Sequence, residues 1–127
     1  MNETPVYAIK VSALASYIED QSIPDQDRYV FAYSITISNT GNVPARLLRR
    51  HWLITDANNR TREVHGDGVI GMQPRLLPGE TYSYTSGAML ETPVGCMQGN
   101  YDMVADDGTE FIADIPAFSL ATRESLH

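Results

Sequence analysis

Residues 46–87 read RLLRRHWLITDANNRTREVHGDGVIGMQPRLLPGETYSYTSG, and this stretch decides the fold. Polar and apolar residues alternate along 46–56, the turn residues Ala57-Asn58-Asn59 follow, and 60–64 returns as a second arm. Alternation with a period of two is typical of a β-strand, and a tight turn between two such runs predicts a β-hairpin. Glycines and prolines interrupt residues 66–79 without a helical period, which predicts an ordered loop with at most one short strand.

The same period of two continues on both sides of this stretch. Residues 28–39 give the cleanest strand, because β-branched and aromatic residues alternate there with serine and threonine. Further strands are expected at 6–17, 81–86, 98–105 and 109–116, and loops at 21–27, 39–44 and 92–99. About seven strands without a helical segment predict an all-β fold, an antiparallel β-sandwich of the fibronectin type III or immunoglobulin-like kind.

Length and composition set the class of protein. The chain has 127 residues, of which 43% are hydrophobic and 20% charged, which predicts one globular domain over 1–127 with an ordered core at roughly 5–120. No run approaches the ~20 apolar residues of a membrane span, and the first residues, MNETPVYAIK, do not resemble a secretory signal. The single cysteine, Cys96, cannot form an internal disulfide, so we expect a reducing, cytoplasmic location and no membrane partner.

Charge is unevenly distributed along the chain. The net charge of −7 makes nucleic acid an unexpected partner, because like charges repel the phosphate backbone. Residues 46–75 nevertheless carry six arginines against three acids, a local charge of +3, while the remainder carries −10. An anion would therefore be drawn to 46–75.

Five runs of sequence resemble the bacterial ApaG family, also called CorD. They are YVFAYSITISNTG, LLRRHWLITDANNR, REVHGDGVIGMQPRLLPGETYSYTSG, GCMQGNYDM and FIADIPAFSL, and the likeness extends in order from about Val6 to Leu120. The resemblance implies a fibronectin-type sandwich in a small cytoplasmic protein. It also implies genetic associations with diadenosine polyphosphate hydrolysis, cobalt resistance and magnesium transport. Similar domains in F-box proteins and in a protein that interacts with a DNA polymerase are interaction modules, so the resemblance favours a binding role.

Gly66, Gly68 and Gly71 match the G-x-G-x-x-G fingerprint of dinucleotide-binding folds. That fingerprint places a pyrophosphate at the amino end of a following helix. Here prolines follow and no helical period is present, so the dinucleotide interpretation is disfavoured. Two interpretations stay open: the glycines permit positive φ in a tight connection, or the loop amides and nearby arginines form a weak site for phosphate or pyrophosphate.

The arginines at positions 46, 49, 50, 60 and 62 lie on two arms of the predicted hairpin. Side chains on one face of paired strands lie about 5 Å apart, so some guanidinium groups should cluster. They form either a solvated face paired with Asp56 and Glu63, or a site for an anion or an acidic partner. We predict that Arg49, Arg50 and Arg62 add to anion binding beside the glycines.

Metal ligands and nucleophiles give weaker patterns. His51 and His65 are candidate metal ligands, although two histidines without a patterned carboxylate also occur as packed, hydrogen-bonded residues. Four acids are candidate oxygen ligands for Mg²⁺ or Co²⁺, or solvated residues at a hairpin tip: Asp102, Asp106, Asp107 and Glu110. Cys96 has no partner base nearby in sequence. We therefore assign no catalytic residue and no firm cofactor, with weak Co²⁺ or Mg²⁺ binding left open.

The sequence thus predicts a non-enzymatic binding or adaptor module that uses the arginine-rich hairpin and the glycine loop to contact an unidentified protein partner. The alternative is a sensor that binds pyrophosphate, a dinucleoside polyphosphate or a divalent metal. A phosphate-ester or pyrophosphate hydrolase is disfavoured, because no nucleophile–base pair can be named. An exposed edge strand makes a homodimer possible. Trp52 is expected in the core.

Overall fold

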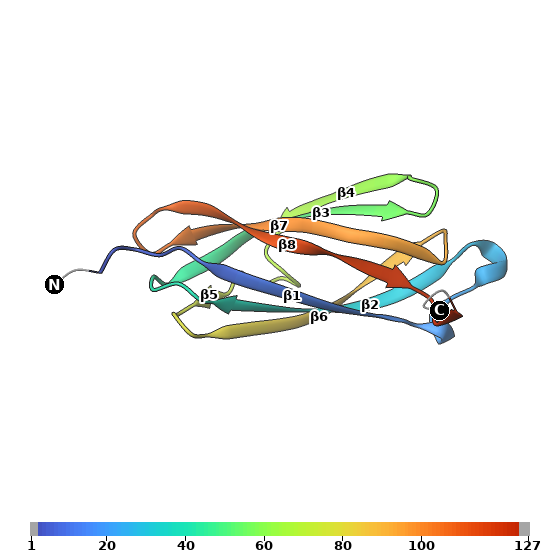
Figure 1. Ribbon diagram of the computed structural model, residues 1–127, viewed down its shortest axis with the longest axis horizontal. Helices are drawn as coiled ribbons and strands as arrows, with labels where there is room; N and C mark the ends of the chain where they lie inside the picture. Colours follow the sequence, from blue (N-terminus) through green and yellow to red (C-terminus); the bar gives the residue numbers. More distant parts are fainter. Residues whose placement is uncertain (1–2, 125–127) are drawn as a thin grey trace.

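In the computed structural model, which describes residues 3–124, eight β-strands form two antiparallel sheets packed as a sandwich (Figure 1). The strands are β1 (Ile9–Tyr17), β2 (Tyr29–Asn39), β3 (Ala45–Asp56), β4 (Thr61–Asp67), β5 (Arg75–Leu76), β6 (Thr81–Leu90), β7 (Val94–Ala105) and β8 (Glu110–Ala121). One sheet has the order β1-β2-β6 and the other the order β4-β3-β7-β8, with β5 also paired to β3. The prediction of an all-β sandwich is confirmed.

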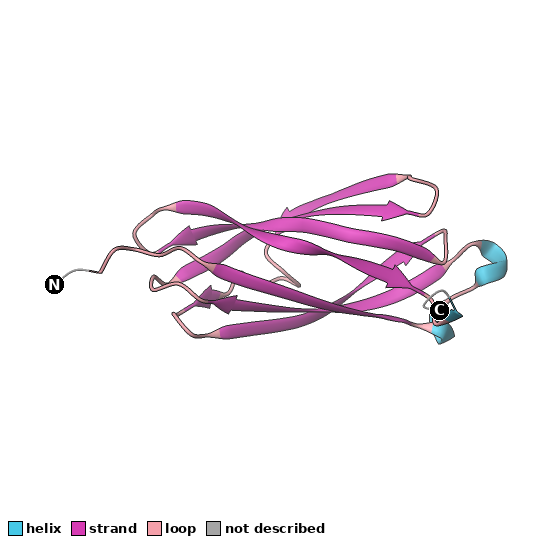
Figure 2. Cartoon of the chain, in the orientation of Figure 1, coloured by secondary structure: helices cyan, strands magenta, loops and turns pink. Residues whose placement is uncertain are grey.

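Between β1 and β2 lie two single turns of 3-10 helix, η1 (Glu19–Gln21) and η2 (Pro24–Gln26), drawn in cyan in Figure 2. Both lie in or beside the segment that was predicted as a loop, where Pro24 starts the second turn. No helix within residues 3–124 has the length and apolar character that crossing a membrane requires.

The core lies between the two sheets and consists of the inward-facing residues of the alternating strands. Phe31, Ile35 and Ile37 come from β2, and Tyr101 and Met103 from β7, and all are fully buried. Trp52 is 2% exposed and meets Tyr33 edge-on, with ring centroids 5.4 Å apart. The expectation that Trp52 is a core residue is therefore confirmed.

A β-bulge at Leu48 changes the alternation along β3. The pairing of β3 with β7 shifts register between Leu47 and Arg49, so Leu48 has no opposite residue. Before the bulge Leu47 is buried, and after it Trp52 and Ile54 are buried. The prediction of one uninterrupted alternation through 46–56 was therefore wrong. A bulge inserts one extra residue, so the side chains after it point to the opposite face from the one that the alternation predicts.

Several predicted boundaries were also wrong. The loop predicted at 92–99 is short, because β7 already begins at Val94 and pairs with the end of β8. Strand β8 continues through Pro116 to Ala121, since the proline lies at a second bulge, opposite the register shift between Met97 and Gly99. Thr122, directly after the end of β8, is also buried. Of the two ends predicted to lie outside the ordered core, 1–4 and roughly 121–127, residues 1–2 and 125–127 are not among the described residues.

The two long sides of the sandwich differ. On one side β1 lies beside β8 (Figure 1). On the other side the edge strands are β4 and β6. The segment between β4 and β5 inserts Val69 into the core and leaves it 1% exposed. This segment therefore belongs to the packed structure and is not a loose surface connection.

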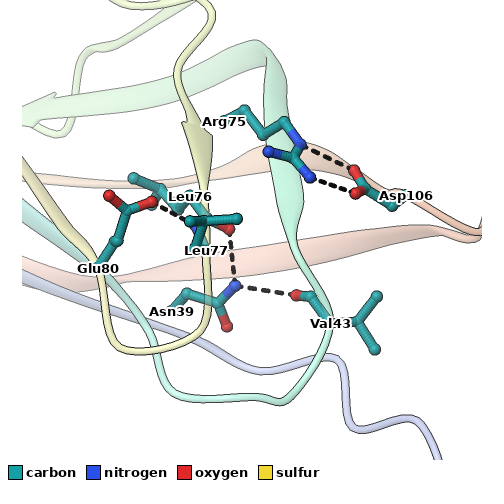
Figure 3. A network of polar contacts seen from close by, with 7 residues as sticks. All are labelled: Asn39, Val43, Arg75, Leu76, Leu77, Glu80 and Asp106. Atoms are coloured by element: carbon teal, nitrogen blue, oxygen red, sulfur yellow. Dashed lines mark hydrogen bonds and ion pairs between the residues drawn. The ribbon is translucent and has the colours of Figure 1, made fainter.

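Asn39, at the end of β2, joins three separate segments (Figure 3). Its Nδ2 donates to the carbonyl oxygens of Val43, at 2.9 Å, and Leu76, at 3.0 Å, while its Oδ1 accepts from the amide of Gly41 at 2.9 Å. The side chain is 2% exposed, so these bonds are shielded from water. Asn39 thereby ties β5 and the turn after β2 to the three-stranded sheet.

A partly exposed ion pair between Arg75 and Asp106 lies near Asn39, at the same end of the molecule (Figure 3). The guanidinium group binds both carboxylate oxygens, Nε to Oδ1 at 3.0 Å and Nη2 to Oδ2. The hydrogen bonds from Arg75 lower the pKa of the Asp106 carboxyl below its ordinary value. Strand β5 is thus connected to the turn between β7 and β8.

Candidate functional site

The connection from β4 to β5, which we call the glycine loop (residues 68–74), is built on one edge of β3. Strand β7 pairs along one edge of β3, so β4 and β5 share the other edge, with the loop between them. The carbonyl oxygen of Leu48, at the bulge, accepts hydrogen bonds from the Gly68 amide at 2.8 Å and from Gln73 Nε2 at 2.9 Å. The bulge therefore provides the attachment point for the loop.

Two arginines of β3 hold the two ends of the glycine loop. Arg50 Nη1 donates to the carbonyl oxygens of Asp67, at 3.0 Å, and Gly68, at 2.9 Å. Arg46 Nη1 donates to the carbonyl oxygen of Gln73 at 2.8 Å. Because charged donors make stronger hydrogen bonds than neutral ones, these contacts fix where the loop leaves and rejoins the sheet.

The tip of the glycine loop is a tight turn that exposes two apolar side chains. The amide and carbonyl groups of Val69 and Met72 bond reciprocally at 2.8 and 2.9 Å, and the two residues between them have positive φ, 47° at Ile70 and 74° at Gly71. Positive φ at both central residues is typical of a type I′ turn. Ile70 is 61% exposed and Met72 is 54% exposed. The turn thus holds a β-branched residue in a conformation that such residues rarely adopt.

The glycines have local structural reasons to be glycine. A Cβ at Gly66 would lie 2.6 Å from Cζ of Arg50, so the guanidinium group packs directly on this backbone. Gly68 has a φ of 63°, and a Cβ there would lie 2.3 Å from the carbonyl oxygen of Met72. No helix follows Gly71 within the described chain, where β5 and then β6 come next. The structure therefore lacks the helix that a dinucleotide fingerprint requires.

The loop amides are largely used within the protein. Gly68 and Val69 donate to the carbonyl oxygens of Leu48 and Met72. An anion-binding nest of successive amides alternates right-handed and left-handed residues, whereas Ile70 and Gly71 both have positive φ. Phosphate binding by Gly66, Gly68 and Gly71 remains a prediction without direct support from the loop geometry.

The structure separates the three arginines that were predicted to act together. Arg49 and Arg50 line one shallow depression of about 300 Å³ with Gly66, and Arg49 Nε is paired with Asp102 Oδ2 at 3.0 Å. Arg62 lines a different depression at the far end of β4, where Nη2 donates to the carbonyl oxygen of Met89 at 3.3 Å. Arg62 lies opposite Ile54 and Gly66 lies opposite Arg50, so the two positions are about 13 Å apart along the strands.

His51 and His65 lie opposite each other on the solvent-facing side of the β3–β4 hairpin. Their rings are stacked, with centroids 4.3 Å apart and planes inclined by 16°. Glu63 lies two residues before His65, and its Oε2 is 3.6 Å from His65 Nε2. Within residues 3–124, one group of at least three possible metal ligands has its atoms close together, and it consists of these three residues. Sequence reasoning named the histidines but missed Glu63, which only the strand register associates with them.

The other sequence candidates do not converge. Asp102, Asp106 and Asp107 each have a separate partner, namely Arg49, Arg75 and the hydroxyl of Tyr7. The Tyr7 hydrogen bond lowers the pKa of the Asp107 carboxyl below its ordinary value. Cys96 lies opposite Thr55, and its Sγ donates a weak hydrogen bond to the carbonyl oxygen of Met97 at 3.8 Å. These residues therefore do not assemble a magnesium site or a thiol–base pair.

Comparison with known proteins agrees with the fold and the sequence pattern. A family model described as the ApaG domain matches residues 19–105. Protein ApaG of Xanthomonas oryzae pv. oryzae (strain PXO99A) is 58% identical over 127 residues, 100% of both chains, and that of Aromatoleum aromaticum is 57% identical over the same span. The crystal structure of an ApaA protein from Bordetella pertussis has a TM-score of 0.90 at 49% identity, and covers 92% of this chain and 95% of that one. The chain therefore belongs to the ApaG family.

Proposed function

We propose that this chain is a non-enzymatic protein-binding module, and that the exposed tip of its glycine loop, Ile70 and Met72, is the recognition element. The observation that carries the proposal is the backbone of Ile70, a β-branched residue with a φ of 47° whose side chain is 61% exposed. The left-handed conformation costs a non-glycine residue about 1–2 kcal/mol. Glycine or asparagine would fit the turn better, so stability does not explain isoleucine at this position.

Exposed apolar side chains on a strained turn are typical of binding sites. Strained backbone positions cluster where ligands and partners are held. Complete burial of an isoleucine or methionine side chain contributes about 1.5–3 kcal/mol. Ile70 and Met72 protrude from the same turn and are both more than half exposed, so a partner with one apolar pocket could bury them together.

The anchoring of the loop supports the same function. A flexible loop loses conformational entropy when a partner orders it, whereas a loop that is already fixed does not. Arg46 and Arg50 hold the two ends of the glycine loop, and Val69 holds it to the core. In this proposal the arginine-rich hairpin supports the recognition element and is not itself the main contact.

The partner we infer is a folded protein with an apolar pocket, and we place the interaction in the cytoplasm. The family resemblance implies an association with cobalt resistance and magnesium transport. An adaptor can influence metal homeostasis through its partner, so this association does not require the glycine loop to bind metal.

The test is a quantitative pull-down with three forms of the immobilised chain. The parent and Ile112→Asn should retain the same partner, while Ile70→Asn should retain at least tenfold less of it. Ile112 is the matched control, because it is also an isoleucine, is 61% exposed and lies in a regular strand. A partner lost equally from both variants, or lost only from Arg49→Ala/Arg50→Ala, would contradict recognition by the loop tip.

A second candidate is a sensor for a small anion such as pyrophosphate or a dinucleoside polyphosphate. It is favoured by one observation, the depression in which Arg49, Arg50, His51 and His65 meet. Ligand binding to the native state should raise the melting temperature, and Arg49→Ala should reduce that rise. Absence of heat at millimolar pyrophosphate and low salt would exclude the sensor. A phosphate-release assay on the same samples tests the hydrolase alternative.

A further inference from the structure

We propose that His51, Glu63 and His65 form a binding site for one divalent transition-metal ion, of the Zn²⁺ or Ni²⁺ type. The site lies on the solvent-facing side of β3 and β4, separate from the tip of the glycine loop. It does not depend on the protein-binding function proposed above.

Strand register brings the three side chains together. His51 and His65 are directly opposite in the antiparallel pair β3–β4. Glu63 and His65 are two residues apart on β4, and side chains at that spacing point to the same face. Two imidazoles from adjacent strands and one carboxylate therefore lie together on one face of the hairpin.

The distances suit coordination after a small rearrangement. One potential ligand atom from each residue lies within 4.8 Å of the others, and His65 Nε2 is 3.6 Å from Glu63 Oε2. In a tetrahedral site with metal–ligand bonds of about 2.0–2.2 Å, the ligand atoms are about 3.4 Å apart. A metal lies in the plane of each imidazole that binds it, so the stacked rings must turn apart. The His65 side chain is 67% exposed and has room to turn.

The environment of His51 provides a second, independent observation. Its Nε2 is buried and has no hydrogen-bond partner among the described residues. A histidine retained for packing ordinarily has its buried polar atoms paired. A packing role alone therefore leaves His51 unexplained, whereas coordination gives its imidazole a polar partner.

The ligand set selects the kind of metal. Imidazole nitrogen suits Zn²⁺, Ni²⁺ and Co²⁺, whereas Mg²⁺ and Ca²⁺ prefer a shell of oxygen atoms. Three protein ligands leave at least one coordination position for water or another ligand. The two nitrogen ligands therefore favour transition metals over Mg²⁺, although the ions carry the same charge.

The test is a calorimetric titration of the full chain with Zn²⁺ after removal of metal by chelation, in a phosphate-free buffer at pH 7.5. We expect one equivalent to bind to the parent, and His65→Gln to weaken binding at least tenfold. Glu63→Gln should weaken it less, because both imidazoles remain. Both residues are largely exposed, so the variants should melt within a few degrees of the parent. Mg²⁺ at the same concentration should give no binding heat.

Two controls exclude other ligands in the chain. Cys96→Ser removes the single thiol, and His127→Gln removes the third histidine, which lies outside the described residues. Both variants should bind Zn²⁺ as the parent does. The proposal is overturned if His65→Gln binds like the parent, if either control abolishes binding, or if the parent shows no binding at 1 mM Zn²⁺.

Discussion

The guanidinium group of Arg50 lies in the space that a side chain at Gly66 would need. The two residues are opposite each other in β3 and β4, and a Cβ at Gly66 would be 2.6 Å from Cζ of Arg50. From that position Arg50 reaches the carbonyl oxygens of Asp67 and Gly68. The glycine is therefore required by an arginine that holds the loop, rather than by a bound phosphate.

We predict that Gly66→Ala destabilises the protein by about 1.5–3 kcal/mol. The end of the Arg50 side chain can move away from the added methyl group, but it then loses hydrogen bonds of the charge-assisted kind. Urea unfolding measures the change. Gly87→Ala is the control, because the nearest atom to its Cβ would be the carbonyl oxygen of Phe31 at an ordinary 3.5 Å. Equal stability of the two variants would show that Arg50 does not depend on Gly66.

We predict that Ile70→Asn stabilises the folded protein by about 1 kcal/mol, because asparagine tolerates the left-handed conformation that isoleucine resists. Ile112→Asn should instead destabilise it slightly, since β-branched residues favour strands. Chemical denaturation of the two variants beside the parent gives both values. A loss of stability in Ile70→Asn would mean that the side chain contributes packing that its 61% exposure does not suggest.

We predict that Asn39→Ala costs at least about 2 kcal/mol, because the carbonyl oxygens of Val43 and Leu76 lose their donor and the Gly41 amide loses its acceptor. For a domain of this size that loss lowers the melting temperature by roughly 8 °C. Asn58→Ala is the comparison, since Asn58 is exposed in the turn after β3 and its side chain should contribute little. A melting temperature near that of the parent would show that water replaces the amide without cost.

We predict that stability falls above pH 10 because two tyrosines remain protonated in the core. The hydroxyl groups of Tyr84 and Tyr101 are 2.5 Å apart, and burial raises the pKa of Tyr84 to about 12 and that of Tyr101 further. Since these pKa values are higher in the folded chain than in the unfolded one, the stabilisation is complete below pH 10 and is lost as the pH rises from there. Each group steepens the decline by up to about 1.4 kcal/mol per pH unit.

The comparison is Tyr84→Phe/Tyr101→Phe, which removes both hydroxyl groups together. Its free energy of unfolding should decline less steeply than that of the parent between pH 10 and 11, as measured by urea unfolding at each pH. Parallel declines would assign the alkaline sensitivity to other groups.

The architecture followed from the sequence because period-two alternation is a local property of each strand. What local alternation could not reveal was the bulge at Leu48, which places Leu47 and Trp52 on the same side of the sheet although they are five positions apart. Nor could it show that β7 begins at Val94, because Pro93 and Gly95 resemble turn residues until the pairing with β8 is known. Both the bulge and the start of β7 depend on the register between strands, which is a tertiary property.

The candidate site was less predictable for the same reason. Arg50 was expected to face an anion, but it donates to loop carbonyl groups that only the fold brings within reach. Pairing of Glu63 with an arginine was one of two interpretations of the hairpin, whereas the register places Glu63 beside His65. The exposed tip at Ile70 could not be anticipated, because two apolar residues in a row between Gly68 and Gly71 do not indicate which of them is buried or which has a positive φ.

The shared edge of β3 has a consequence for how this domain can vary. Strands β4 and β5 bond to that edge on either side of the bulge. The turn between Val69 and Met72 is closed by hydrogen bonds between those two residues and is not part of either sheet. A foreign peptide inserted at Ile70–Gly71 should leave the scaffold folded and be displayed on it. Natural divergence of binding preference could proceed by the same route, through exchange of a short segment without redesign of the sandwich.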